Sequence, residues 1–490
     1  LRCAKERPQI CEGSVPMERL LITGGVPLKG EVCVQGAKNS SLPLLAATVL
    51  CHGQTVLHNC PELSDVDAAC QILSYLGCRV EREGRTVTVD ARDVSGGAVP
   101  DRLMREMRSS VVFLGAIAAR LGHANISFPG GCELGPRPID LHLFALRKLG
   151  LTVREDRGCL DCTVNGRLKG TNITLSFPSV GATENILLAA ATAEGTTVIT
   201  NAAREPEIID LADFLNRCGA KVKGAGEGVI TIEGVERLTP CEHTVIPDRI
   251  VAATYLCCGA ATGGDVTVCH TDPTHLAGIL PVFEEMGCSL TVEKDRVRLK
   301  APEGRLRAVK DVRTMPYPGF PTDAQAPVMA LSALADGTSV FVENIFESRY
   351  KHASELARMG AHIKLEGRVA LVEGTEKLYG APVAATDLRG GAALVVAGLA
   401  AEGQTAISSA RHGWPRCGRP HHRLRHPSHR PWLRADRRSP DPAGSKDPAG
   451  SGKLIHKKRE VRKEEKRWTN DALPSRIPGG EAFPLPAAVR

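Results

Sequence analysis

The sequence predicts an α/β fold built from six similar units, and two repeated markers carry that prediction. The first marker is a run of small apolar residues that ends in a glycine and opens a short strand-like run. It recurs with spacings of 69, 73, 69, 73 and 66 residues, at Gly53, Gly122, Gly195, Gly264, Gly337 and Gly403. Helix patterns that alternate with strand patterns indicate α/β units, and a regular period indicates repetition.

The second marker closes five of the six units. It is an amphipathic helix pattern that stops at a glycine before another strand, at Gly77, Gly150, Gly219, Gly287 and Gly360. No sixth copy follows Gly403, where a stretch rich in Pro, Arg and His replaces the expected helix and closing strand. We therefore expect six units, three in each of two domains, with the sixth unit incomplete.

Composition and hydropathy narrow the class of protein. The chain has 490 residues, 42% hydrophobic and 24% charged, as is ordinary for a globular protein of two or three domains. Because no apolar run reaches the ~18–20 residues of a membrane span and no signal peptide opens the chain, we expect a cytoplasmic protein without a membrane partner. Most of the 17 cysteines should then be reduced thiols. We interpret Cys159 and Cys162, the one C-x-x-C pair, as strand residues rather than zinc ligands.

The positive charge is confined to the C-terminal end. Residues 411–490 hold 20 Lys and Arg against 8 Asp and Glu, a balance of +12, whereas residues 1–410 hold 42 against 47. All three tryptophans, Trp414, Trp432 and Trp468, lie in this tail. A basic segment with aromatic residues can bind nucleic acid, but this one lacks a periodic apolar face. We favour an unfolded tail, and a nucleic-acid partner stays open as the alternative.

Buried helices with polar N-termini indicate an anion site. The helical runs at 42–50 and 186–192 are apolar all round, as is typical of helices inside a domain. Polar turns precede six such runs, at residues 36–40, 107–110, 179–183, 247–249, 321–323 and 386–389. Helix N-termini offer unpaired N–H groups and partial positive charge. Together with five cationic residues they predict a phosphate-bearing ligand: Lys38, Arg108, Arg137, Arg349 and Arg389.

Individual residues of these turns allow two roles. For Ser40 and Thr183 we favour N-capping of the helices that follow. Lys38 and Arg389 oppose the helix dipole at an N-terminus, so a phosphate or carboxylate beside them is the expected reason for their presence. Asp323 can cap a helix or act as a general base toward a substrate hydroxyl, and the residues alone leave both roles open.

Cys132 lies in a loop that favours reactivity. Glycine and proline surround it in the segment 129–138, and a guanidinium follows at Arg137. Such loops are exposed, and a nearby positive charge lowers the pKa of a thiol. A reactive thiol and an inert small side chain are both compatible with this context.

Several motifs together resemble the UDP-N-acetylglucosamine 1-carboxyvinyltransferase family of enolpyruvyl transferases. They lie in register from about residue 20 to about residue 407, in the segments 36–43, 129–138, 179–183, 319–323, 346–349 and 385–389. The sister family that acts on shikimate 3-phosphate shares the six-unit fold. The Cys132 loop followed by Arg137 and Pro138 resembles the UDP-sugar enzymes instead. Residues 1–16 match nothing in the family, so Met17 is the expected start.

The resemblance implies a fold and domain boundaries. The fold is a two-domain inverse α/β barrel, with the first strand region in the C-terminal domain. We expect an N-terminal-type domain at 37–246 and a discontinuous C-terminal-type domain at 17–36 plus 247–410. Residues 1–16 would form an extension and residues 411–490 a tail. A monomer is favoured.

Roles for site residues also come from the resemblance. Lys38 and Asn39 would hold phosphoenolpyruvate, and Arg349 and Arg389 would bind anionic groups or lock the closed form. The turn at 248–249 matches a family turn with a structural role. UDP-N-acetylglucosamine would contact a larger set: Arg108, Arg137, Pro138, Ile139, Asp140, Leu141, Ser179, Val180, Gly181, Asp323 and Ile345.

The implied reaction transfers the enolpyruvyl group of phosphoenolpyruvate to the 3-hydroxyl of UDP-N-acetylglucosamine and releases phosphate. It is the first committed step of peptidoglycan synthesis. Cys132 would protonate the methylene carbon, Asp323 would take the hydroxyl proton, and Lys38 with other basic groups would stabilise the departing phosphate. The same thiol would make the chain a target of the epoxide fosfomycin. The scheme needs no metal and no organic cofactor.

The resemblance breaks after Gly403. The family continues with a His-x-x-Arg-Gly-Tyr type segment, a helix and a strand, and that arginine contributes to the phosphoenolpyruvate site. Here residues 408–412 begin like that segment and then break into Gly-Trp-Pro-Arg-Cys, the pattern of a shifted reading frame. Losing a helix and a strand would cost on the order of several kcal/mol. An inactive substrate-binding relative and a shikimate-type enzyme therefore stay open as alternatives.

Overall fold

Six small sheets form the framework of the molecule. The structure, a computed structural model, describes residues 19–128 and 139–408. Five sheets contain four strands each, and their strands in spatial order are β14 (Glu242–Thr244), β3 (Gln54–His58), β5 (Thr86–Asp90) and β4 (Arg79–Glu83); β6 (Ala98–Val99), β7 (His123–Ser127), β9 (Cys159–Val164) and β8 (Leu151–Asp156); β10 (Asn172–Thr174), β11 (Thr196–Thr200), β13 (Val229–Glu233) and β12 (Lys221–Lys223); β2 (Lys29–Cys33), β15 (Asp265–Cys269), β17 (Arg296–Lys300) and β16 (Ser289–Val292); and β18 (Asp311–Arg313), β19 (Thr338–Val342), β21 (Val369–Glu373) and β20 (His362–Glu366).

The five four-stranded sheets share one pairing pattern. In each, a short strand runs parallel to the second strand, and the last strand of the unit lies antiparallel between the second and the third. In the third unit, for example, β10 is parallel to β11, while β13 is antiparallel to both β11 and β12. Alternation along β13 buries Ile230 and Ile232 and exposes Val229, so one face of the sheet covers a core. The repeated pattern confirms the predicted units.

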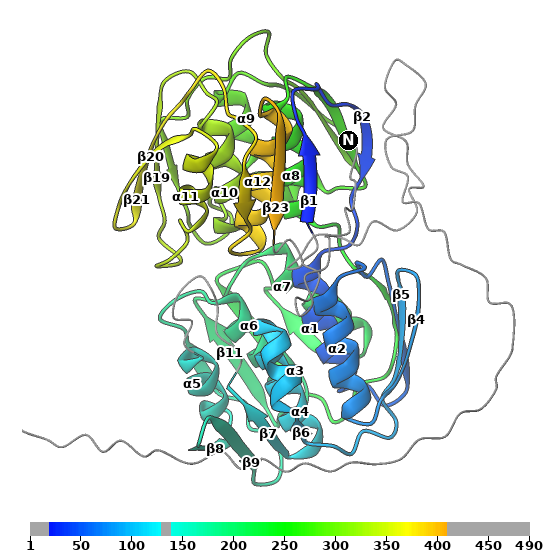
Figure 1. The fold of residues 1–490 in the computed structure, drawn as a ribbon. Helices are drawn as coiled ribbons and strands as arrows, with labels where there is room; N and C mark the ends of the chain where they lie inside the picture. Colours follow the sequence, from blue (N-terminus) through cyan, green and yellow to red (C-terminus); the bar gives the residue numbers. More distant parts are fainter. Residues whose placement is uncertain (1–18, 129–138, 409–490) are drawn as a thin grey trace, which may run out of the picture. The chain divides into compact units, whose positions relative to one another are not determined.

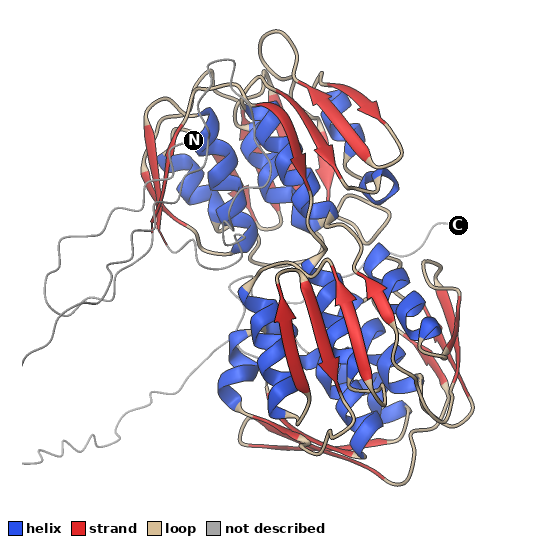
Figure 2. Cartoon of the chain, turned by 90° about the vertical axis from the view of Figure 1, so that its right-hand side faces the viewer, coloured by secondary structure: helices blue, strands red, loops and turns tan. Residues whose placement is uncertain are grey.

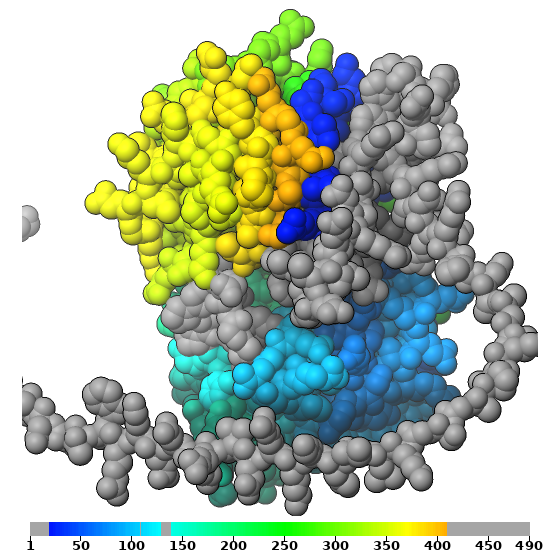
Figure 3. Space-filling view, in the orientation of Figure 1, coloured from blue at the N-terminus to red at the C-terminus, as the bar shows by residue number. Residues whose placement is uncertain are grey.

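The sixth sheet is built differently, from both ends of the described chain. Its strands are β1 (Arg19–Thr23), β23 (Gln404–Ser408) and β22 (Pro382–Ala384). β22 is parallel to β23, as in the other units, but β1 pairs antiparallel with β23 in the place of the unit's own last strand. β1 and β23 lie side by side in the ribbon and on the surface (Figures 1 and 3). The sequence analysis had expected the chain beyond Gly403 to close this sheet; within the described residues the N-terminal strand does so.

Helices form the inner layer of the fold, and Figure 2 shows the strands outside them. They are α1 (Lys38–Thr48), α2 (Ser64–Tyr75), α3 (Asp101–Glu106), η1 (Arg108–Val112), α4 (Phe113–Leu121), α5 (Asp140–Lys148), α6 (Val180–Ala190), α7 (Pro206–Arg217), α8 (Arg249–Ala261), η2 (Pro273–Leu276), α9 (Leu280–Glu285), α10 (Thr322–Ser332), α11 (His352–Arg358) and α12 (Leu388–Ala400). The helices predicted to be apolar all round, α1 and α6 among them, are buried over nearly their whole length.

Two separate hydrophobic cores account for the buried side chains. One core draws its residues from Leu42 to Val245, and helices α1, α4, α6 and α7 pack in it. The other draws on Ile22, Val34 and residues 252–407, and helices α8, α10 and α12 pack against one another there. Both cores are built from interlocking units rather than from consecutive layers.

Two expectations about side chains and helices are settled by the fold. Cys159 is exposed and Cys162 is buried on β9, so the C-x-x-C pair consists of strand residues, as predicted. Among the helices within the described ranges, none is long and apolar enough to cross a membrane.

Candidate active site

Charged residues gather at the N-termini of three buried helices. Lys38 is the first residue of α1, and Asp323 and Arg389 are the second residues of α10 and α12. Arg389 Nη2 donates to Asp323 Oδ2 at 3.0 Å. The charge of Lys38 also acts on Asp323. Residues that are far apart in the sequence therefore form one cluster, at helix ends whose N–H groups favour an anion.

Asp323 is held between two guanidiniums. Arg349 Nη2 donates to its Oδ1 at 3.0 Å, while Arg389 takes the other oxygen. Burial disfavours the charged carboxylate, but Arg389, Arg349 and Lys38 outweigh this and hold the pKa of Asp323 well below its usual range. The N-cap of α10 is Pro321, so Asp323 does not cap its helix. The carboxylate is ionised and its two oxygens are occupied by arginines.

Arg349 is the most deeply buried cation of the cluster. Its side chain is only 2% exposed, and it also donates to Thr322 O at 3.1 Å and lies 3.6 Å from Asp387 Oδ2. Its Nε has no hydrogen-bond partner within the described residues. Beside it, burial lowers the pKa of His352 to about 4, so this histidine is neutral at physiological pH. A buried cation that keeps a free donor suits an incoming anionic group.

Carboxylates stand beside the two cations that oppose their helix dipoles. Lys38 Nζ lies 2.9 Å from Asp65 Oδ2, in the first turn of α2, and Arg389 pairs with Asp323. Sequence reasoning missed Asp65. An acidic residue at a helix start was visible there, but nothing in the sequence connected it with a lysine 27 positions away.

The capping predictions for Ser40 and Thr183 are wrong. Both helices begin earlier than expected, so both residues lie inside a helix. The Ser40 hydroxyl donates to Asp210, and the Thr183 hydroxyl donates to Ser179 O at 2.9 Å. The side chains that do cap buried helices are Ser179 on α6, Asp248 on α8 and Asp387 on α12.

The turn at 248–249 connects the cluster to its surroundings. Asp248 Oδ2 accepts the backbone N–H of Lys38 at 3.2 Å, while Oδ1 caps α8. Arg249 is buried, donates through Nε to Glu207 Oε1 at 3.0 Å, and lies 5.5 Å from the ring of Tyr317. These contacts are those of a residue that holds structure together.

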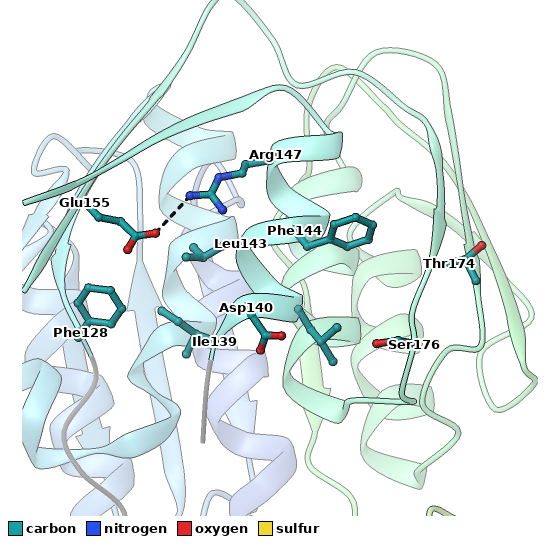
Figure 4. Close-up of a pocket in the computed structure, with 10 residues that line it drawn as sticks. Phe128, Ile139, Asp140, Leu143, Phe144, Arg147, Glu155, Thr174 and Ser176 are labelled. Carbon is teal, nitrogen blue, oxygen red and sulfur yellow. Dashed lines mark hydrogen bonds and ion pairs between the residues drawn. The ribbon is translucent and has the colours of Figure 1, made fainter. Parts of the chain in front are cut away.

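A second group of predicted residues lines a cavity of about 690 Å³ at the start of α5. Figure 4 shows Phe128 and Phe144 on its walls, with Arg147 joined to Glu155 at 3.2 Å. The full lining is Phe128, Ile139, Asp140, Leu141, Leu143, Phe144, Arg147, Glu155, Thr174 and Ser176. A mostly apolar wall with a few polar groups is typical of a site for an organic ligand.

The turn at the start of α6 packs against α5. A side chain on Gly181 would place its Cβ 2.9 Å from His142 Cε1, so only glycine fits there. His142 Nδ1 lies 2.8 Å from Asn185 Nδ2, which fixes the ring. The predicted residues Ser179 and Val180 therefore sit in a turn of fixed shape.

The remaining predicted residues are only partly placed. Asn39 is the second residue of α1 and is partly buried, and Ile345 lies after β19 with its backbone N–H on Glu343. Arg108 begins η1, but its side chain is outside the described residues. Three further positions lie outside the described residues altogether, Cys132, Arg137 and Pro138.

The comparison with protein families defines the class of protein. The family model described as EPSP synthase (3-phosphoshikimate 1-carboxyvinyltransferase) matches residues 22–416. Among solved structures, the enolpyruvyl transferase NikO from Streptomyces tendae aligns with a TM-score of 0.73 and 27% identity, covering 81% of this chain and 94% of that one. EPSP synthase from Acinetobacter baumannii, at 22% identity and a TM-score of 0.64, shares the fold. The molecule is thus a carboxyvinyl transferase by fold, and the predicted two-domain α/β architecture is confirmed.

Curated relatives narrow this class. The chain is 52% identical over 396 residues to UDP-N-acetylglucosamine 1-carboxyvinyltransferase 2 of Caldanaerobacter subterraneus subsp. tengcongensis, covering 81% of this chain and 94% of the relative. It is 48% identical over 396 residues to the UDP-N-acetylglucosamine 1-carboxyvinyltransferase of Acinetobacter baylyi, with the same coverage. The chain therefore belongs to the UDP-N-acetylglucosamine 1-carboxyvinyltransferase family, as the motifs predicted.

Proposed function

We propose that the chain transfers the enolpyruvyl group of phosphoenolpyruvate to the 3-hydroxyl of UDP-N-acetylglucosamine, with release of phosphate, as the first committed step of peptidoglycan synthesis. The observation that carries this proposal is the cluster of Lys38, Arg349 and Arg389 around Asp323. Three cations and one carboxylate at helix N-termini suit an anionic substrate whose reaction also needs a base.

In this proposal phosphoenolpyruvate binds to the cations of the cluster. Its phosphate and carboxylate take hydrogen bonds from Lys38, Asn39 and Arg389, and Arg349 completes the neutralisation of charge. A substrate anion that draws both guanidiniums away from Asp323 also removes the cause of its low pKa. Asp323 then gains the basicity to accept the proton of the sugar hydroxyl. Substrate binding would thus switch on the base.

UDP-N-acetylglucosamine is assigned to the residues around α5 and α6. Ile139, Asp140 and Leu141 line the cavity of Figure 4, whose aromatic walls suit a flat ring. The fixed turn of α6 supplies backbone groups beside them. The resemblance adds the rest of the set: Arg108, Arg137, Pro138, Ser179, Val180, Gly181, Asp323 and Ile345.

Cys132 is the proposed proton donor to the methylene carbon. Its assignment rests on the family motif in the segment 129–138, because the residue lies outside the described residues. Protonation makes the neighbouring carbon electrophilic, so the thiol must keep its proton near the working pH. Fosfomycin alkylation of the same sulfur follows from this role.

The domain boundaries and the compartment are part of the proposal. We assign residues 37–246 to one domain and residues 17–36 plus 247–410 to the other, supported by the two hydrophobic cores. We expect a cytoplasmic monomer that needs no metal or organic cofactor.

Product analysis tests the proposal. The full chain is incubated with phosphoenolpyruvate and either UDP-N-acetylglucosamine or shikimate 3-phosphate, and the products are identified by mass spectrometry. We expect an enolpyruvyl adduct of the UDP-sugar alone, a strong loss of turnover for Cys132→Ser, and turnover without fosfomycin alkylation for Cys132→Asp. An adduct of shikimate 3-phosphate, or fosfomycin on another cysteine, would overturn the assignment.

A further inference from the structure

Three cysteines from distant parts of the chain meet in one of the cores. Cys51 follows α1, Cys218 is the C-cap of α7, and Cys241 immediately precedes β14. Cys218 Sγ lies 3.2 Å from Cys241 Sγ and 3.6 Å from Cys51 Sγ. Cys51 and Cys218 are fully buried, whereas Cys241 retains partial exposure. The pair with the shorter separation therefore also has the sulfur that an outside reagent can reach.

Backbone hydrogen bonds hold the closer pair in place. Thr239, two residues before Cys241, donates to Cys218 O through its N–H at 2.9 Å and through its hydroxyl at 3.2 Å. Val56 N donates to Cys241 O at 3.2 Å, which fixes that residue against β3. A disulfide needs a sulfur separation of about 2.05 Å, so the thiols need approach by only roughly 1 Å. Side-chain rotation supplies a movement of this size without a shift of the backbone.

The two thiols differ in acidity. The hydrogen bond from Cys218, helped by the charges of His243 and Arg217, outweighs burial and lowers the pKa of Cys241 to about 7. The same hydrogen bond and a second one to Cys51 raise the pKa of Cys218. At neutral pH the negative charge is favoured on Cys241, the more exposed sulfur, and the thiolate is the reactive form.

We propose that Cys218 and Cys241 form a reversible disulfide when the protein meets a hydroperoxide. The Cys241 thiolate attacks the outer oxygen of the hydroperoxide, the O–O bond breaks, and the leaving alkoxide takes a proton to become an alcohol. Cys241 is then a sulfenic acid. Cys218 loses its proton and attacks the Cys241 sulfur, the S–O bond breaks, and hydroxide leaves as water. Two thiols and one hydroperoxide give one disulfide, one alcohol and one water.

A metal site is the competing interpretation of three neighbouring thiols. Within residues 19–128 and 139–408, no group of three or more His, Cys, Asp or Glu side chains has an arrangement that could hold a metal ion. The disulfide also has a structural consequence, since it closes a loop between positions 23 residues apart. Closing such a loop should raise Tm by about 5–10 °C. None of this depends on the proposed function.

Peptide mapping tests the disulfide in the full-length protein. After treatment with hydrogen peroxide and alkylation of the free thiols, trypsin cuts at Arg217, Lys221, Arg237 and Arg249. We expect peptide 218–221 linked to peptide 238–249, one link per chain, reversed by dithiothreitol and accompanied by the rise in Tm. Cys241→Ser should lose the link, and Cys51→Ser should keep it.

Cys159→Ser serves as the matched control, because Cys159 is exposed on β9 and should not affect the link. Circular dichroism of each variant checks that the fold is intact. Two outcomes overturn the proposal. One is a link from Cys218 to Cys51 in the unaltered chain, and the other is oxidation of Cys241 to sulfinic acid without any link.

Discussion

Asp323 is the residue on which the proposed chemistry turns, because it is at once the base and the partner of two arginines. In the unliganded structure its pKa is held well below its usual range, so it is ionised but weakly basic. The arginines keep it charged and positioned until an anion arrives. Its fixed charge also explains why two guanidiniums tolerate burial at the same place.

The first prediction concerns the charge of this residue. Asp323→Asn keeps the shape of the side chain but removes the base, and we expect kcat to fall by ~10²-fold or more. Steady-state kinetics with both substrates measures the effect. Asp336→Asn is the matched control, since Asp336 is an exposed aspartate paired with Arg305 and should leave kcat unchanged. A kcat at the level of the unaltered chain would rule out the base role.

A second residue gives a prediction for pH. Glu184 is 7% exposed, and burial, together with the charges of Glu207 and Glu205, raises its pKa well above the ordinary value. A raised folded-state pKa contributes stability below the unfolded value of about 4.3, and that contribution is lost as the pH rises through the folded value. Glu184→Gln cannot ionise, so its Tm should match the unaltered chain at pH 4 and exceed it increasingly toward pH 8.

Thermal unfolding between pH 4 and pH 8 measures this difference. Glu194→Gln is a suitable control, because Glu194 is only partly buried and lies past the end of the same helix. A Tm difference that does not change with pH would show that Glu184 carries no proton-linked penalty.

At the scale of elements, β1 is the piece that the sixth unit depends on. It pairs with β23 over five residues, and Ile22 enters the second core with no exposed surface. The N-terminal strand thereby contributes to a sheet whose other strands come some 360 residues later in the chain, which ties the two ends of the described region together.

The third prediction follows from this pairing. Ile22→Ala should lower the free energy of unfolding by about 2–4 kcal/mol, because it removes buried methyl groups from a packed core. The control is Thr23→Ala on the same strand, whose exposed side chain should change stability by less than ~0.5 kcal/mol. Urea unfolding measures both. Equal effects of the two substitutions would mean that β1 does not carry the sheet.

Across the whole molecule, local signals explain which features the sequence could predict. The six units were predictable because each helix of small residues ends at a glycine at a regular spacing, and Gly122, Gly195 and Gly403 adopt positive φ at these ends. Lys38 and Arg389 were predictable as anion-facing residues because their charge opposes a helix dipole. Both signals lie within a few neighbouring residues.

Features that depend on distant contacts were not predictable. The partners Asp65 of Lys38 and Asp210 of Ser40 come from other helices, and neither is marked by spacing. The pairing of β1 in the sixth sheet was missed for the same reason. Ser40 was misjudged because its helix starts two residues earlier than the capping pattern suggested, and helix boundaries are the least reliable part of such a prediction.

The central claim is that this chain, including its unusual C-terminal end, performs carboxyvinyl transfer. The most direct measurement is phosphate release from phosphoenolpyruvate in the presence and absence of UDP-N-acetylglucosamine, with Asp323→Asn and Cys132→Ser measured beside the unaltered chain. The account predicts release that requires the UDP-sugar and that falls strongly in both variants. Absence of release from a folded chain that binds both substrates, or equal release by the Asp323 variant, would contradict it.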